Sequence, residues 1–194
     1  MNYRATFALI AALALSACGL NSVPTAEENA KARWADVQNN YQRRADLIPN
    51  LVATVKAAGA QEKDILVQVT QARAAASQVK LTGDDLTDPA KVAAYDRAQA
   101  GVSLYLQRLQ EAYPELKSQA NYTTLMSQLE GTENRITIAR KDYNDAVQAY
   151  NTRIRTFPDA IGAKVFYGSK PMAPFQATTP GSDTAPSVNF GNTN

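Results

Sequence analysis

Histidine is absent from this sequence of 194 residues, and cysteine occurs once, at position 18. Histidine-based metal sites and the Ser-His-Asp and Cys-His nucleophile arrangements are therefore excluded. A single cysteine cannot form a disulfide within the chain, and once its thiol is modified no ligand remains for thiolate zinc or iron-sulfur sites. Any enzyme built on this chain would have to use carboxylates, lysine, tyrosine, serine or threonine.

An excess of charge of one sign is also lacking, since 20 Lys and Arg residues stand against 18 Asp and Glu residues. Acidic residues are interspersed with the basic ones along the whole chain. Nucleic-acid-binding domains instead concentrate basic residues on one face or along one helix. The composition therefore does not predict nucleic acid as a partner.

The longest apolar run lies at the N-terminus, where Arg4 precedes the apolar residues 7–15. A membrane-spanning helix needs about 20 apolar residues, and this run is interrupted at Ser16. It ends in Leu15-Ser16-Ala17-Cys18-Gly19, where small residues precede the cysteine. This pattern predicts a lipoprotein signal peptide over residues 1–17.

The lipoprotein signal peptidase would cut before Cys18, whose thiol would carry a diacylglyceryl group, and the acyl chains would hold the protein at a membrane. Residues 18–25 would then form a tether. The expected location is the bacterial cell envelope, with a membrane-anchored lipoprotein facing the periplasm or the cell exterior.

Helix-forming residues dominate from position 26 to 157, where the only prolines are Pro49, Pro89 and Pro114. Apolar residues three and four apart predict helices over residues 26–58, 62–80, 89–112 and 121–156. Asp88 is the expected N-cap of the third helix, with Pro89 at its first position, and Asn121 is the expected N-cap of the fourth. Pro49 should kink the first helix.

The predicted fold is all-α, an antiparallel up-and-down four-helix bundle over residues 26–158 with long first and last helices. Residues 159–194 form an irregular tail rich in Pro and Gly. We expect residues 159–175 to pack on the bundle through Phe166, Tyr167 and Phe175, and residues 176–194 to be disordered.

Several polar residues interrupt the apolar helix faces, among them Arg44 in the first helix and Glu133 in the fourth. Antiparallel packing of these helices would bring Arg44 near Glu133, because both lie at similar heights at 1.5 Å rise per residue. The sequence therefore predicts an ion pair between them, with Asn144 as an alternative acceptor. Its expected role is to specify helix register rather than to add net stability.

The residues proposed for an interaction surface or a structural polar network are Arg43, Arg44, Asp46, Asn50, Glu130, Glu133, Asn134, Arg140, Asn144 and Asn151. Glu130 and Glu133 also raise the question of acid-base catalysis, since glycosidases use paired carboxylates. Any two acids on one helix face meet that spacing, so an ion pair and a solvated side chain explain them better. No catalytic residue, metal site or cofactor is predicted.

Three separated motifs connect these positions to a known family. They are the segments 41–52 (YQRRADLIPNLV), 113–117 (YPELK) and 129–158, which begins LEGTENRI and ends YNTRIRTFP. Over most of residues 30–175 the chain resembles the LemA family of bacterial envelope proteins. The resemblance implies an antiparallel four-helix bundle anchored at its N-terminus, and it brings no reaction, cofactor or ligand. A lipoprotein signal replaces the family's usual transmembrane helix, and residues 176–194 form an extension.

The predicted function is a non-catalytic, lipid-anchored envelope module that acts as a scaffold or binds an envelope protein of unknown identity. The exposed face carrying Arg43, Asp46 and Asn50 would supply contacts that core packing does not require. Two alternatives stay open at this stage. One is a hydrolase acting on peptidoglycan through Glu130 and Glu133, and the other is a carrier with a small-ligand cavity between the first and fourth helices.

Overall fold

The computed structural model describes residues 21–59 and 63–176. Within these residues every regular element is helical and no strand occurs, which confirms the predicted all-α class. The four long helices are α2 (Ser22–Ala57), α3 (Lys63–Gln78), α4 (Pro89–Ala112) and α5 (Ala120–Arg153). The predicted signal peptide, Cys18 and the tail beyond Gln176 lie outside the described residues.

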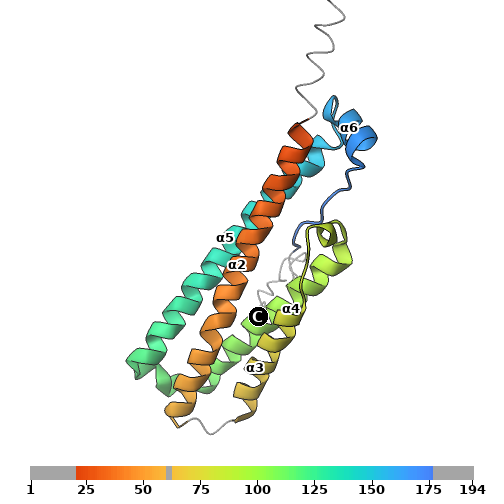
Figure 1. The fold of residues 1–194 in the computed structure, drawn as a ribbon. Helices are drawn as coiled ribbons and strands as arrows, with labels where there is room; N and C mark the ends of the chain where they lie inside the picture. The colour runs from red at the N-terminus through yellow and green to blue at the C-terminus, as the bar shows by residue number, and fades with distance from the viewer. Residues whose placement is uncertain (1–20, 60–62, 177–194) are drawn as a thin grey trace, which may run out of the picture.

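Figure 1 shows an elongated rod in which α2 and α5 lie side by side and run in opposite directions. The helices α3 and α4 form a second pair beside them, and successive long helices alternate in direction. Shorter elements connect and close the rod: the 3-10 helices η1 (Asp84–Thr87) and η2 (Pro114–Ser118), the short helix α6 (Asp159–Gly162) and the π-helical turn η3 (Ala163–Tyr167). The α6 segment lies at the end of the rod where α2 begins.

The start of α4 follows the prediction. The Asp88 carboxylate accepts hydrogen bonds from the amides of Ala90 at 2.9 Å and Lys91 at 3.4 Å, and Pro89 occupies the first helical position. The predicted cap at Asn121 is wrong, because α5 begins at Ala120 with Gln119 as its N-cap. The 3-10 turn η2 leads directly into α5, and the Gln119 carbonyl already accepts the first helical hydrogen bond from the Thr123 amide.

The predicted tether 18–25 is wrong over its last four residues, because Ser22–Thr25 form the first turn of α2. Pro24 is tolerated there, since the first amides of a helix have no partner within it. Val23 is only 1% exposed and joins the core, which gives this turn a reason to stay helical. The helix therefore extends closer to the predicted anchor than the sequence indicated.

Pro49 lies within α2, which continues as one helix to Ala57. A proline in a helix leaves the carbonyl four residues before it without its usual donor. In this chain that carbonyl belongs to Ala45, and Arg73 of α3 donates its Nε–H to it at 2.7 Å. The proline thus provides a point at which α3 is bonded to α2.

Two hydrophobic clusters fill the rod. The first, called here the aromatic core, lies toward the α6 end and includes Trp34, Tyr41, Tyr95, Tyr143, Tyr150 and Phe175. The second, called the aliphatic core, lies toward the other end and includes Ile48, Leu51, Val55, Leu66, Val69, Leu106, Leu109 and Leu129. The polar residues Arg44 and Gln99 are buried between them along the helices.

The segment after α5 differs in part from the prediction. Phe175 is buried, as expected, but Phe166 and Tyr167 are 68% and 44% exposed. The reason is that α6 and η3 turn their small residues Gly162 and Ala163 inward, so the neighbouring aromatic side chains point outward. Gly168 then adopts a left-handed conformation with φ of 57°, which ends the π-helical turn and starts an extended segment.

Candidate binding site

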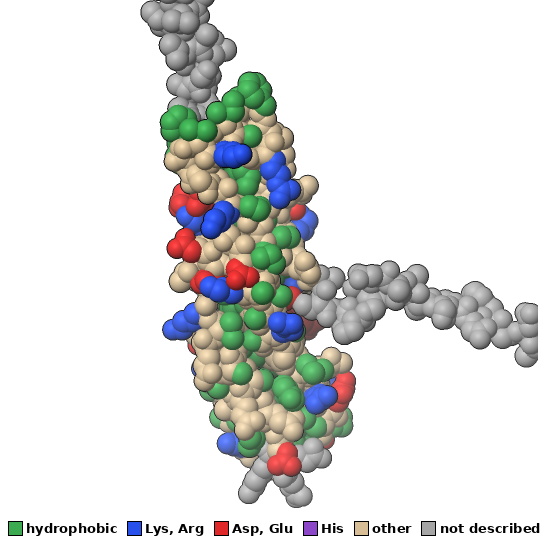
Figure 2. Space-filling view, turned by 90° about the vertical axis from the view of Figure 1, so that its right-hand side faces the viewer, with side chains coloured by type: hydrophobic (Ala, Val, Ile, Leu, Met, Phe, Trp, Pro, Cys, Tyr) green, Lys and Arg blue, Asp and Glu red, His purple; other side chains and the backbone are tan. Residues whose placement is uncertain are grey.

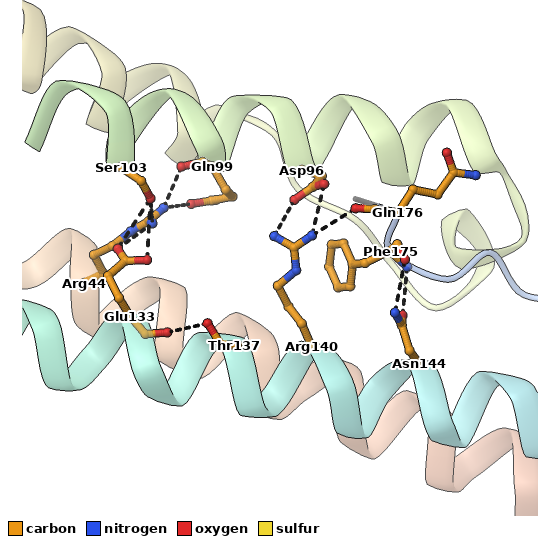
Figure 3. A network of polar contacts seen from close by, with 10 residues as sticks. All are labelled: Arg44, Asp96, Gln99, Ser103, Glu133, Thr137, Arg140, Asn144, Phe175 and Gln176. Carbon is orange, nitrogen blue, oxygen red and sulfur yellow. Dashed lines mark hydrogen bonds and ion pairs between the residues drawn. The ribbon is translucent and has the colours of Figure 1, made fainter. Parts of the chain in front are cut away.

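A layer of polar side chains crosses the rod between the two cores (Figure 3). Arg44 of α2 donates through Nη1 to the Glu133 carboxylate of α5 at 2.8 Å and to the Ser103 hydroxyl of α4 at 2.7 Å. Its Nη2 donates to the Gln99 backbone and side-chain oxygens at 2.9 and 2.7 Å. The predicted Arg44–Glu133 ion pair is confirmed, and we call this set the polar layer.

The guanidinium of Arg44 is buried, with the residue only 2% exposed. Burying an unpaired charge is expensive, so such a group persists only with several partners. Four hydrogen bonds supply them, and the Tyr41 ring adds a cation-π contact at 4.9 Å. Because these partners come from α4 and α5, the layer can be satisfied in only one register of the helices.

A second ion pair lies two helical turns further along α5. Arg140 contacts Asp96 of α4, with Nη1 to Oδ1 at 2.8 Å and Nη2 to Oδ2 at 3.2 Å. Burial raises the pKa of the Asp96 carboxyl above its ordinary value, and the Arg140 charge opposes that shift. Arg140 also lies over the Phe175 ring at 4.5 Å and donates to the Gln176 carbonyl at 3.4 Å.

Asn144 and Asn151, one heptad apart on α5, bind the backbone of the extended residues 169–176. Asn144 donates to the Phe175 carbonyl at 3.0 Å and accepts from the Phe175 amide at 2.8 Å. Asn151 makes the same pair of bonds with Met172, at 2.8 and 2.9 Å. Asn144 is therefore not an acceptor for Arg44, so that alternative is wrong; its amide pairs with a backbone peptide, which offers one donor and one acceptor.

Two tyrosines complete this hold on the segment. Tyr143 donates its hydroxyl to the Ala173 carbonyl and Tyr150 donates to the Lys170 carbonyl, both at 3.0 Å. On the other side of the segment the Ala173 amide donates to the Leu86 carbonyl of η1 at 2.8 Å. Residues 169–176 are thus bound as an extended peptide in a groove between α5 and the start of α4, which we call the peptide groove.

The comparison with protein families bears on this arrangement. The model of the LemA family matches residues 33–190, which is most of the chain. This chain belongs to the LemA family. The match includes all of the polar layer, the peptide groove and the segment within it. It also extends past Phe175, so most of the region that the sequence marked as an extension falls within the family match. A comparison with curated proteins finds no match.

Five of the residues singled out in this LemA-family chain lie together in the polar layer and the peptide groove. They are Arg44, Glu133, Arg140, Asn144 and Asn151. The other five are exposed and lie outside both: Arg43, Asp46 and Asn50 on α2, and Glu130 and Asn134 on α5. Among these, Asp46 accepts a hydrogen bond from its neighbour Gln42 at 2.7 Å.

Sequence reasoning missed Asp96, Gln99 and Ser103, although a signal for them exists. They continue the spacing of the buried stripe of α4, which contains Val92, Tyr95, Val102 and Leu106. A carboxylate and an amide on a face that otherwise carries apolar side chains require buried partners, by the argument that identified Arg44. Applied to the third helix, that argument would have located the partners of Arg44 and Arg140.

Cavities adjoin both parts of the site. One of about 530 Å³ lies beside residues 171–176 and is lined by Val92, Asp96, Asn151 and Phe175 among others. Another of about 370 Å³ lies between α2, α3 and α4. Over residues 21–59 and 63–176, no three Cys, Asp or Glu residues are grouped to hold a metal ion. In the same part of the chain, no helix combines the length and apolarity that crossing a membrane requires.

Proposed function

We propose that this LemA-family chain is a non-catalytic, lipid-anchored interaction module of the bacterial cell envelope, built as an up-and-down four-helix bundle. The observation that supports it best is the peptide groove, in which Asn144 and Asn151 bind a peptide backbone. In this arrangement a binding surface is already occupied by a segment of the same chain. In this proposal the helical rod carries the groove at a distance from the proposed anchor at Cys18.

The contacts in the groove explain which kind of partner would fit. The two asparagines, Tyr143 and Tyr150 all bond to backbone atoms and place no demand on side-chain identity. Side-chain selection comes from the aromatic core, where Phe175 lies 5.7 Å from Trp34 and 5.5 Å from Tyr143, measured between ring centroids. A partner would therefore present an extended segment with an aromatic residue, as Met172-Ala173-Pro174-Phe175 does.

The chain's own segment competes with any partner because it is covalently attached and therefore at high effective concentration. The test uses a fluorescent peptide with the sequence of residues 169–176 and the full-length protein carrying Phe175→Ala, which weakens the internal segment. Fluorescence anisotropy should show that the peptide binds this variant more tightly than the unchanged protein. Adding Asn144→Ala and Asn151→Ala should abolish binding, whereas adding Asn134→Ala, an exposed asparagine of the same helix, should not.

Pull-downs from solubilised envelopes would separate the groove from the exposed set on α2. A partner lost with Asn144→Ala and Asn151→Ala but kept with the triple variant Arg43→Ala, Asp46→Ala and Asn50→Ala belongs to the groove. A partner kept with the asparagine variant but lost with the triple variant would assign the interaction surface to α2. Identical partner lists from all three proteins would contradict both assignments.

The two alternative functions have less support. The Glu133 carboxylate accepts from Arg44 in the polar layer, whereas Glu130 is exposed, so the two acids do not share one environment. Release of peptidoglycan fragments that depends on either glutamate would reverse this preference. The 370 Å³ cavity lies between α2, α3 and α4. A cavity lined by both the first and the fourth long helices is smaller, about 200 Å³, and the polar layer lines it. A ligand-dependent rise in melting temperature would support a carrier role.

A further inference from the structure

An exposed apolar patch covers the end of the rod where α2 begins. Five large hydrophobic side chains lie within eleven residues of sequence there: Phe157 (82% exposed), Ile161 (57%), Val165 (69%), Phe166 (68%) and Tyr167 (44%). The remaining exposed large hydrophobic residues in the described part of the chain are Val67, Leu104 and Ile138, which lie singly on three different helices. Figure 2 shows hydrophobic side chains gathered at this tip.

The patch is built into the fold. Gly162 and Ala163 are buried, and Ala163 packs in the aromatic core, which fixes α6 and η3 and leaves their large side chains facing outward. Scattered exposed apolar residues are ordinary, but a contiguous group marks a surface that another phase or molecule covers. The aromatic residues are also of the type enriched where proteins meet the interface of a bilayer.

The position of the patch relative to the N-terminus identifies what covers it. The first described residue, Asn21, is three positions after Cys18, and a chain spans at most about 3.6 Å per residue. Asn21, the N-cap of α2, is therefore within about 11 Å of the Cys18 Cα atom, whatever the path between them. Because α6 contacts α2 at this same end, lipidation of Cys18 would hold the patch against the membrane surface.

The charges around the patch suit a phospholipid surface. Four basic residues flank it, Arg153, Arg155, Lys164 and Lys170, and all are exposed. Asp159 is the only acidic residue between positions 153 and 170, and Glu27 and Glu28, near the start of α2, are paired with Lys31. Basic residues beside apolar and aromatic ones favour binding to anionic headgroups, and membrane anchoring by lipid is stable when a second signal accompanies the first.

We propose that the patch formed by Phe157, Ile161, Val165, Phe166 and Tyr167 inserts into the interface of an anionic phospholipid bilayer and sets the rod upright on it. This inference rests on the proposed lipid anchor at Cys18. The patch acts as a second, weaker membrane contact, and it fixes the orientation that a flexible lipid attachment leaves free. The peptide groove then faces sideways, away from the bilayer.

The test uses the full-length lipidated protein in vesicles of phosphatidylethanolamine and phosphatidylglycerol, some with brominated acyl chains. Phe166→Trp places a fluorophore in the patch, and Val67→Trp places one at an exposed apolar position on α3, toward the other end of the rod. Bromolipid should quench the added fluorescence of Phe166→Trp and leave that of Val67→Trp unchanged. Replacing phosphatidylglycerol by phosphatidylcholine should weaken the quenching.

Flotation of the vesicles in a density gradient shows whether a negative result contradicts the patch alone or the lipid anchor as well. Protein that floats while Phe166→Trp shows no quenching would overturn the patch and leave the anchor intact. Protein that does not float would overturn the anchor and the patch with it. Equal quenching at both positions would also contradict an upright rod, because the two ends could not then be distinguished by depth.

Discussion

The aromatic and aliphatic cores are closed by different means. The buried α3 residues Leu66, Val69 and Ala76 all belong to the aliphatic core, which is formed by helices and the short turn η2 alone. The aromatic core lies beyond the end of α3 and is completed by Met172, Ala173 and Phe175 instead. One end of the rod is therefore closed by a helix and the other by an extended segment, and the proposed binding of a partner peptide concerns the second end.

Truncating the centre of the aromatic core should have the largest effect. Trp34→Ala removes ring contacts with Tyr95, Tyr143 and Phe175. We expect a loss of about 3–5 kcal/mol of unfolding free energy, the range for a buried tryptophan. Because Trp34 packs on Phe175, residues 169–176 should also detach more readily, which amide hydrogen exchange at Met172 and Phe175 would record.

The matched change in the aliphatic core is Leu109→Ala, at a fully buried position. It should cost about 2–5 kcal/mol in urea denaturation, yet leave the local opening of residues 169–176, measured by amide exchange, as it is in the unchanged protein. If Trp34→Ala and Leu109→Ala increase the opening of residues 169–176 equally, the claim that only the aromatic core holds this segment is wrong.

Removing one member of the polar layer should have an intermediate effect. Glu133→Ala leaves the buried Arg44 without its carboxylate, and we expect a loss of about 1–3 kcal/mol, since Glu133 itself is partly exposed. Glu130→Ala, one helical turn away and exposed, should stay within about 0.5 kcal/mol of the unchanged protein. Equal melting temperatures for the two variants would contradict a contribution of the polar layer to stability.

Removing the hydrogen bonds of one asparagine to residues 169–176 should lower the free energy of unfolding less. Asn151→Ala removes two hydrogen bonds to Met172, and we expect a loss of about 1–2 kcal/mol. The effect should be confined to the aromatic end, so limited proteolysis should cut near residues 169–176 before it cuts α3 or α4. Asn134→Ala, exposed on the same helix, serves as the control and should change neither stability nor the site of cleavage.

The smallest expected effect is the pH dependence of stability in alkaline solution, which depends on the buried tyrosines of the aromatic core. Burial raises the pKa of Tyr41, Tyr95 and Tyr143 above the ordinary value of about 10. The folded state therefore retains these protons where the unfolded chain loses them, and stability should fall as the pH rises above about 10. Tyr95→Phe should lessen this fall in melting temperature, whereas Tyr167→Phe, at an exposed position, should not.

The helices and the Arg44–Glu133 contact could be predicted because both follow from periodicity and a fixed rise per residue. The partners of Asn144 and Asn151 could not, because they are backbone atoms of a segment that has no repeating pattern. The exposure of Phe166 was missed for a related reason: composition alone does not say which face of a single turn is held inward by Gly162 and Ala163. Periodic helices could be predicted from the sequence, whereas the contacts of an irregular segment with a distant helix could not.

The last described residue, Gln176, lies beside Arg140, well along α5 and away from either tip of the rod. The described chain therefore ends at the waist of the molecule, on the flank that carries the groove. A label attached at Gln176 would lie on this flank, next to Arg140, and would obstruct the groove. Labels meant to leave that flank accessible belong instead at Lys56, which is exposed in the last turn of α2 at the other end of the rod.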